Sequence, residues 1–145
     1  MSKSNTFEND LLLLVFNNTG ISLVGDATGL RGATAAGSLY VSLHTADPGE
    51  PGIQTTSEVA YTSYARVAVA RSGAGFTVTA NSVSPAAAVT FPACTGGTAT
   101  ATYFGIGTDS TGAGKLLYSG SLTPTLSIST GVTAQLTTAT AITED

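Results

Sequence analysis

His44 is the only histidine in the chain, and histidine is the side chain that most often acts as a general acid or base in enzymes. Ser42 and Asp47 lie close to it, so the residue types of a Ser-His-Asp triad occur together. In a strand, Ser42 and His44 would point to the same face, but a triad is defined by geometry and not by sequence proximity. We therefore interpret His44 as a hydrogen-bonded histidine at the end of a strand.

A second pattern, Gly-Ala-Gly-Lys at residues 112–115, resembles the end of a phosphate-binding loop. The complete loop requires a glycine five residues before Gly114 and a serine or threonine after the lysine. Asp109 and Leu116 occupy those two positions, so the pattern fails. We expect a hairpin turn between two strands at this place.

Residues that ligate metals are sparse. Asp47 and Glu50 share one loop and Asp109 lies in another, whereas a calcium loop needs several oxygen ligands at fixed spacing. Asp47 before Pro48 is a common start of a turn. Cys94 is the only cysteine, which excludes an intrachain disulfide and favours a buried or partly buried free thiol. We expect no metal, no cofactor and no enzymatic activity.

The tyrosines are the remaining candidates for ligand binding. They could form a shelf for sugars, as in a receptor-binding fibre, or could be strand residues with a buried ring and a hydroxyl in water. The chain has no tryptophan, which weakens the sugar-binding alternative. The residues concerned are Tyr40, Tyr61, Tyr64, Tyr103 and Tyr118.

Charged residues make up 10% of the chain, well below the ~25% usual in soluble domains, and the net charge is −4. The five lysines and arginines are scattered, so the basic patch that would neutralise nucleic-acid phosphates is absent. The apolar run at residues 11–16 is far shorter than the about 20 residues of a membrane span. We expect neither nucleic acid nor a membrane as a partner. An uncharged surface of threonine, serine, alanine and glycine instead suits wide contact with other protein.

The elements that carry these residues begin with a predicted helix over residues 5–16. Asn5 followed by Glu8 has the spacing of a capping box, and Gly20 is placed to cap the end of the helix. An apolar face with helical spacing follows, which packs either on the chain's own sheet or on a partner chain. That face contains Phe7, Leu11, Leu14 and Val15, and Leu12, Leu13 and Phe16 widen it.

Residues 21–37 contain glycines at short intervals and predict a loop or an extended arm, and loops of this length are usually functional or flexible. From residue 38 onward, short segments separated by turns predict about eight or nine strands of an all-β sandwich or barrel. No helices separate the strands, so the sheets should be antiparallel. These strands are drawn from ten candidate segments, which are residues 39–43, 58–61, 64–70, 76–79, 89–91, 98–106, 116–122, 126–128, 132–136 and 139–143, with a break at 81–86.

Several segments of the chain occur in a distinctive order. They are Asn5 to Phe16, Leu39 to Pro48, Glu58-Val59, Tyr64 to Arg66, Val89 to Pro92, Tyr103 to Ile106 and Leu116 to Gly120. This order resembles that of small tailed-bacteriophage virion proteins, over nearly the whole chain. Many of these carry a tail-fibre label, and similar ones are capsid decoration or cement proteins. The resemblance implies an antiparallel, jelly-roll-like sandwich of about eight strands, with residues 1–37 as helix and arm and residues 38–145 as a single β-sandwich domain.

Two functions compete under this resemblance. The first is a capsid cement protein on the outer capsid surface of the virion, made in the host bacterial cytoplasm, that binds the major capsid protein and stabilises contacts between its subunits. Homodimers or homotrimers are expected, because symmetric shells offer symmetric sites. The alternative is a tail-fibre or receptor-binding virion protein. A short chain without long repeats favours the first. The residues expected to contact a partner are Phe7, Leu11, Leu12, Val15, Phe16, Leu30 and Arg31.

Overall fold

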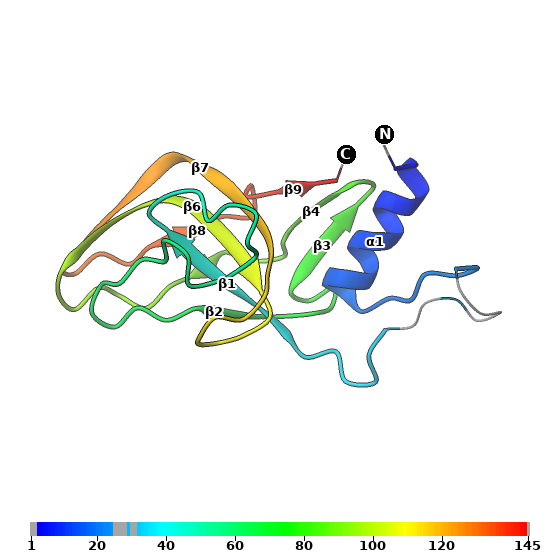
Figure 1. Cartoon of the computed structure of the whole chain (residues 1–145), viewed down its shortest axis with the longest axis horizontal. Coiled ribbons are helices and arrows are strands. Elements are labelled where there is room, and N and C mark those ends of the chain that lie inside the picture. The colour runs from blue at the N-terminus through cyan, green and yellow to red at the C-terminus, as the bar shows by residue number, and fades with distance from the viewer. Residues whose placement is uncertain (1–2, 25–28, 30–31, 145) are drawn as a thin grey trace. The chain divides into compact units, whose positions relative to one another are not determined.

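The computed structural model of this chain describes residues 3–24, 29 and 32–144. Within them it contains one α-helix, α1 (Asn5–Asn17), and nine short β-strands (Figure 1). The strands are β1 (Ser38–His44), β2 (Val67–Ala70), β3 (Phe76–Thr79), β4 (Ser82–Pro85), β5 (Val89–Thr90), β6 (Thr98–Gly107), β7 (Leu116–Ser129), β8 (Gln135–Leu136) and β9 (Ile142–Thr143).

The predicted N-terminal helix is confirmed, but its ends are held by other residues than expected. Ser4 is the N-cap, and its side chain accepts a hydrogen bond from the Phe7 amide at 3.4 Å. Asn18 ends the helix in the left-handed conformation, with φ of 57°, and its amide donates to the Leu13 carbonyl. Asparagine tolerates this conformation better than most residues, so the helix ends before it reaches Gly20.

The helix buries only part of the predicted apolar face. Glu8, Leu12 and Phe16 are buried, whereas Phe7 is 40% exposed and Leu11, Leu14 and Val15 are half-buried. Because leucines occupy four consecutive positions, the helix is apolar on most of its sides. The periodicity alone therefore could not predict which side is buried. Phe16 decides it, because its ring packs edge-to-face on Phe76 with the ring centres 5.0 Å apart.

The chain divides into two compact units, each assembled from separate stretches of sequence. Unit 1 contains Met1–Ser38, Val69–Ala88 and Thr137–Asp145. Unit 2 contains Leu39–Ala68 and Val89–Leu136. The predicted division into residues 1–37 and 38–145 does not group Val69–Ala88 and Thr137–Asp145 with the N-terminal segment, as unit 1 does. The division into domains itself stays a prediction.

Unit 1 packs α1 against a three-stranded antiparallel sheet with the order β3-β4-β9. Arg71 secures the end of the helix, because its guanidinium donates hydrogen bonds to the carbonyls of Leu14, Val15 and Ala36 at 2.7–3.1 Å. At the other end, the Asn9 side chain donates to the Ala80 carbonyl at 2.7 Å. The helix is therefore an integral part of the core of unit 1.

The main sheet of unit 2 has four strands in the order β2-β1-β6-β7. Residues 69–70 of β2 belong to unit 1. Unit 2 also contains the two-stranded sheet β5-β8. The predicted alternation along β1 is present, but both faces are covered, since Val41, Ser42, Leu43 and His44 are all buried. β6 and β7 form a long hairpin whose register shifts in the middle. Residues 122–125 of β7 lie opposite Thr102 alone, so the extra residues of this β-bulge are on β7.

The predicted antiparallel, mostly β architecture is confirmed, but the three sheets show no closed sandwich in the described residues. Residues 82–85 form β4 where a break was predicted, because they pair with both β3 and β9. Residues 58–61 form no strand and only an isolated bridge between Glu58 and His44. The two strands predicted over residues 116–128 are the single strand β7.

Candidate functional site

His44 lies at the centre of a buried polar cluster in unit 2, and its side chain has no exposed surface. Its Nδ1 lies 2.8 Å from the Thr56 carbonyl oxygen, and its Nε2 lies 2.8 Å from Ser42 Oγ. Because the carbonyl can only accept, Nδ1 carries a proton and the neutral ring accepts the Ser42 hydroxyl proton at Nε2. Burial lowers the pKa of His44, and the hydrogen bond to Thr56 opposes that change.

The Ser42–His44 pair cannot act as a nucleophile and its base. Ser42 is fully buried as well, so no substrate reaches its hydroxyl. The third position of a triad is taken by a backbone carbonyl instead of a carboxylate. Asp47 accepts a hydrogen bond from the Gly49 amide within its own turn. The interpretation of His44 as a hydrogen-bonded histidine at the end of a strand is confirmed.

Glu58 and Arg66 form an ion pair next to this histidine. Arg66 Nε and Nη2 donate to the two carboxylate oxygens of Glu58 at 2.7 and 2.8 Å, and the Arg66 side chain is only 3% exposed. The Tyr64 hydroxyl donates to the same carboxylate and accepts from the Leu43 amide. The Glu58 hydrogen bonds raise the pKa of Arg66, and burial raises the pKa of Tyr64 well above its usual range.

The same arginine holds the hairpin loop between β6 and β7, residues 108–115. Arg66 donates to the carbonyls of Asp109 and Gly112, each at 2.8 Å. The Gln54 side chain is fully buried, and its Oε1 accepts a hydrogen bond from the Asp109 amide. The backbone amide of Gln54 donates to the Ala113 carbonyl. The predicted hairpin turn at residues 112–115 is confirmed, and its backbone is held from inside the unit.

Two glycines of β6 make room for this cluster. A methyl group at Gly105 would lie 2.7 Å from both His44 Nε2 and Ser42 Oγ. At Gly107 it would lie 2.1 Å from the amide carbon of Gln54. The polar side chains therefore pack directly on the backbone of β6, which accounts for glycine at both positions.

The tyrosines do not form a shelf. Tyr61 and Tyr64 pack with Phe91 in an aromatic cluster, and the Tyr61 hydroxyl donates to the Pro92 carbonyl at 2.9 Å. Tyr40 and Tyr103 lie on the His44 face of the sheet, whereas Tyr118 is paired with Ile106 on the opposite face. Their distribution agrees with the alternative of strand residues whose rings are partly buried.

The remaining chemical candidates are the possible metal ligands and Cys94. No three residues of the types His, Cys, Asp and Glu gather there as a group that could hold a metal ion. Cys94 is buried, and its thiol donates to the carbonyls of Gly96 and Gly97. No helix among the described residues is long and apolar enough to span a membrane.

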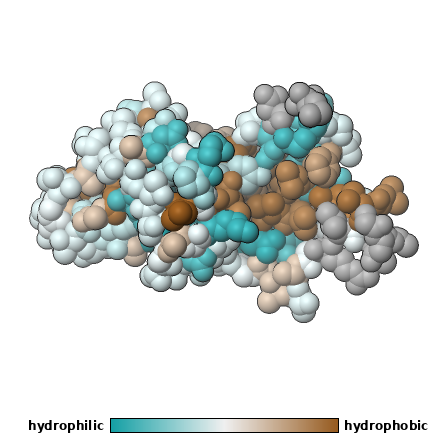
Figure 2. All heavy atoms as spheres, viewed as in Figure 1, coloured by the Kyte–Doolittle hydropathy of each residue, from teal (hydrophilic) through white to brown (hydrophobic). Residues whose placement is uncertain are grey.

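The residues predicted to contact a partner occupy very different environments. Leu12 and Phe16 are fully buried in unit 1 and have no surface to offer. Leu11 and Val15 are half-buried, and Phe7 is exposed. Leu30 and Arg31 lie outside the described residues. Apolar atoms are nevertheless exposed around α1 (Figure 2). Among the described residues of unit 1, the large exposed apolar side chains are Phe7, Leu23 and Val24.

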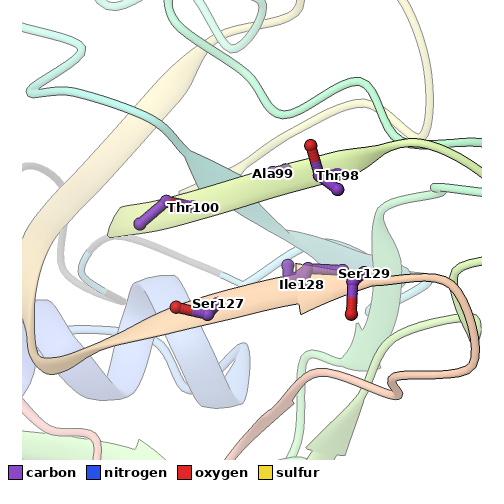
Figure 3. Close-up of a pocket in the computed structure, with 6 residues that line it drawn as sticks. All are labelled: Thr98, Ala99, Thr100, Ser127, Ile128 and Ser129. Carbon is purple, nitrogen blue, oxygen red and sulfur yellow. The ribbon is translucent and has the colours of Figure 1, made fainter.

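The end of the β6–β7 hairpin that lies away from its loop carries an open, uncharged groove of about 520 Å³ (Figure 3). Thr98 is paired with Ser129, and Thr100 with Ser127, so these four exposed, hydroxyl-bearing residues share one face of the hairpin and line the groove. Ala99 and Ile128 complete its lining. Such a surface can exchange hydrogen bonds with a neutral partner at a low cost of desolvation, because it carries no charge.

Comparison with known families decides the identity. The family model described as podophage GP4 fiber I protein gp80 matches residues 2–143. The chain belongs to this family. The match confirms the resemblance to phage virion proteins, and it makes this fiber I family member a structural component of a bacteriophage. No curated protein matches the chain.

Membership of the fiber I family bears on the choice between the two predicted functions. A fibre protein corresponds to the alternative that the sequence ranked second, and the family does not support the capsid cement role. The ranking was wrong because it rested on short length and the absence of long repeats, and the family match shows that neither excludes a fibre protein. A fibre structural protein also agrees with the expected absence of catalysis.

The fiber I chain contains a cluster that sequence reasoning missed. Gln54 was assigned to no element, Glu58 and Arg66 were placed on predicted strands, and Arg66 was counted among the scattered basic residues. One signal was present, because only 10% of the residues are charged and two of opposite sign lie within the short stretch 58–66 around Tyr64. Opposite charges so close in a charge-poor sequence indicate a specific ion pair.

Proposed function

We propose that this chain is a structural component of a podophage fibre and works through contacts between protein chains. The match to the fiber I family over residues 2–143 carries the proposal. The buried cluster around His44 supports it, because these polar side chains have no access to a substrate and instead fix the loops of unit 2.

The contacts would use the uncharged surfaces of the two units. On unit 2, the hydroxyl groups of Thr98, Thr100, Ser127 and Ser129 offer hydrogen bonds along one groove (Figure 3). On unit 1, Phe7 offers apolar surface at the start of α1, with Leu11 and Val15 partly accessible behind it. The major capsid protein and further copies of the chain, the partners expected from the sequence, stay predictions.

The position of the chain in the virion tests this proposal directly. Purified virions would be labelled with an antibody fragment against this chain and imaged by electron microscopy, and the copy number would be measured by quantitative mass spectrometry. Label on the fibres with few copies per virion is expected. Label spread over the head, with copies matching the number of capsid subunits, would overturn the fibre assignment in favour of capsid cement.

Partner binding needs a separate measurement. Emptied capsid shells and isolated tails would each be incubated with the purified chain and sedimented, and the mass of the free chain would be measured by light scattering. Binding to tails but not to shells is expected. Binding to shells alone would contradict the proposal, and the light-scattering mass would show whether the chain forms the predicted dimer or trimer.

A further inference from the structure

Residues 53–58 form a segment that is held on two sides within unit 2. On the β1 side, the Thr45 amide donates to the Ser57 carbonyl at 2.7 Å, and the Val59 amide donates to the Leu43 carbonyl at 3.0 Å. On the other side, Gln54 bonds directly to the loop of residues 108–115, and Glu58 is connected to that loop through Arg66. The segment therefore links β1 to the exposed hairpin loop.

His44 is the ionisable side chain beneath this segment. Its Nδ1–H donates to the Thr56 carbonyl, so the ring holds the middle of the segment, and its Nε2 accepts from Ser42. Close packing surrounds the ring, since a single methyl group at Gly105 would lie 2.7 Å from Nε2. The neutral ring therefore has a hydrogen-bond partner at both nitrogens.

A second proton on this ring would meet an unfavourable environment. The charged and titratable groups around His44 are Glu58 from the segment that covers it, Tyr64 and Arg66 from the stretch that follows, and Tyr103, its partner in β6. The Glu58 carboxylate is already bound by the Arg66 guanidinium and the Tyr64 hydroxyl. An imidazolium would thus be buried next to a paired carboxylate and a cation, and its new Nε2–H would face the hydrogen of Ser42 until that hydroxyl turned.

We propose that His44 is an acid-sensitive latch, and that its protonation releases the segment of residues 53–58 from β1 and with it the hairpin loop of residues 108–115. The step is the binding of one proton at Nε2. Water then reaches the ring and hydrates the imidazolium, which the closed unit cannot do. Unit 1 has no part in the step, and the assignment is independent of the proposed fibre function.

The single histidine makes the latch directly observable. In nuclear magnetic resonance spectra of the full chain, the one imidazole Cε1–H signal reports His44 alone. Its titration would be followed together with hydrogen exchange of two backbone amides. The Gln54 amide donates to the Ala113 carbonyl, and the Asp109 amide donates to the Gln54 side chain. The expected result is one common midpoint, below about pH 6.5, at which the imidazole protonates and these two amides lose their protection factors.

Two outcomes would overturn the latch. One is protonation of His44 while the amides of Gln54 and Asp109 keep their protection. The other is loss of that protection at a midpoint unrelated to the imidazole signal. Amides of the β3–β4 pair in unit 1 serve as the internal control, because their hydrogen bonds lie within that pair, and they should keep their protection throughout.

Variants of the cluster give a second test. In Ser42→Ala the neutral ring loses the hydrogen bond at Nε2, so the midpoint should move to higher pH. In His44→Asn the side-chain amide can still donate to the Thr56 carbonyl but cannot titrate, so the acid transition should disappear. A Ser42→Ala midpoint that stays in place or moves to lower pH, or an acid transition that persists in a folded His44→Asn variant, would contradict the assignment.

Discussion

Arg66 and Glu58 form a two-pronged ion pair inside unit 2, and the same guanidinium continues to the carbonyls of Asp109 and Gly112. One arginine therefore joins two loops that are far apart in the sequence. A planar guanidinium with five donors suits this task, whereas a lysine would offer a single point of attachment. In a chain with so few charges, the pair fixes the shape of an exposed loop more than it adds to a charged surface.

Replacing Arg66 by alanine should destabilise unit 2 strongly. The Glu58 carboxylate, whose side chain is 14% exposed, would lose its counter-charge, and removing one partner of a buried pair costs about 3–5 kcal/mol. The free energy of unfolding would be measured by urea denaturation. The matched control is Lys3→Ala, which removes the lysine of the Lys3–Glu144 pair, whose lysine side chain is 31% exposed, and should cost at most about 1 kcal/mol. Equal losses in the two variants would show that Arg66 does not act as argued.

Gly107→Ala should also destabilise the chain, through packing alone. The added methyl group would lie 2.1 Å from the amide carbon of Gln54, a side chain with no exposed surface. Overpacking of this kind costs about 1–3 kcal/mol. In the control variant Gly73→Ala nothing lies within 4 Å of the new methyl group, so thermal unfolding should shift little. A Gly107→Ala variant as stable as Gly73→Ala would show that Gln54 moves aside freely.

Acid should lower the stability of the whole chain in a defined pH window. Burial lowers the pKa of His44 below 6.5, so the unfolded chain binds this proton more readily than the folded chain does. The free energy of unfolding should therefore be highest above about pH 6.5, fall as the pH drops towards the lowered pKa, and receive no further loss from His44 below it. Urea denaturation at several pH values would show the slope. The His44→Asn variant should have a flatter profile in this window, and an equally steep one would assign the slope to other groups.

The sequence predicted local features better than the elements that hold them together. The helix, β3, β6 and the hairpin loop were predicted because leucine spacing, alternation and glycine turns act over short distances. β4 was missed because its pairing with β3 and β9 depends on residues up to the end of the chain. The part of the apolar face of α1 that is buried could not be selected for the same reason, since it depends on the packing of Phe16 against Phe76 in another element.

The cluster around His44 shows a similar limit. The sequence indicated a hydrogen-bonded histidine next to Ser42, because residues two apart in a strand share a face. It could not indicate Thr56 as the partner of Nδ1, because the segment of residues 53–58 has no regular structure and reaches the ring through a turn. Gln54 and Arg66 act on the hairpin loop from more than 40 positions away in the sequence, as in the 2.8 Å contact from Arg66 to Asp109 that spans 43 residues.

The two phenylalanines of α1 should separate folding from partner binding. Phe16→Ala removes a fully buried ring that packs on Phe76, and such a change costs about 3–5 kcal/mol, so unit 1 should lose its structure. Phe7→Ala removes a ring that is 40% exposed and should change the free energy of unfolding little. If α1 contacts a partner, Phe7→Ala should weaken sedimentation with isolated tails while its circular dichroism spectrum and thermal midpoint stay unchanged. Tail binding that is unaffected by Phe7→Ala would place the contact elsewhere, and the hydroxyl-lined groove of β6 and β7 would then be the surface to test.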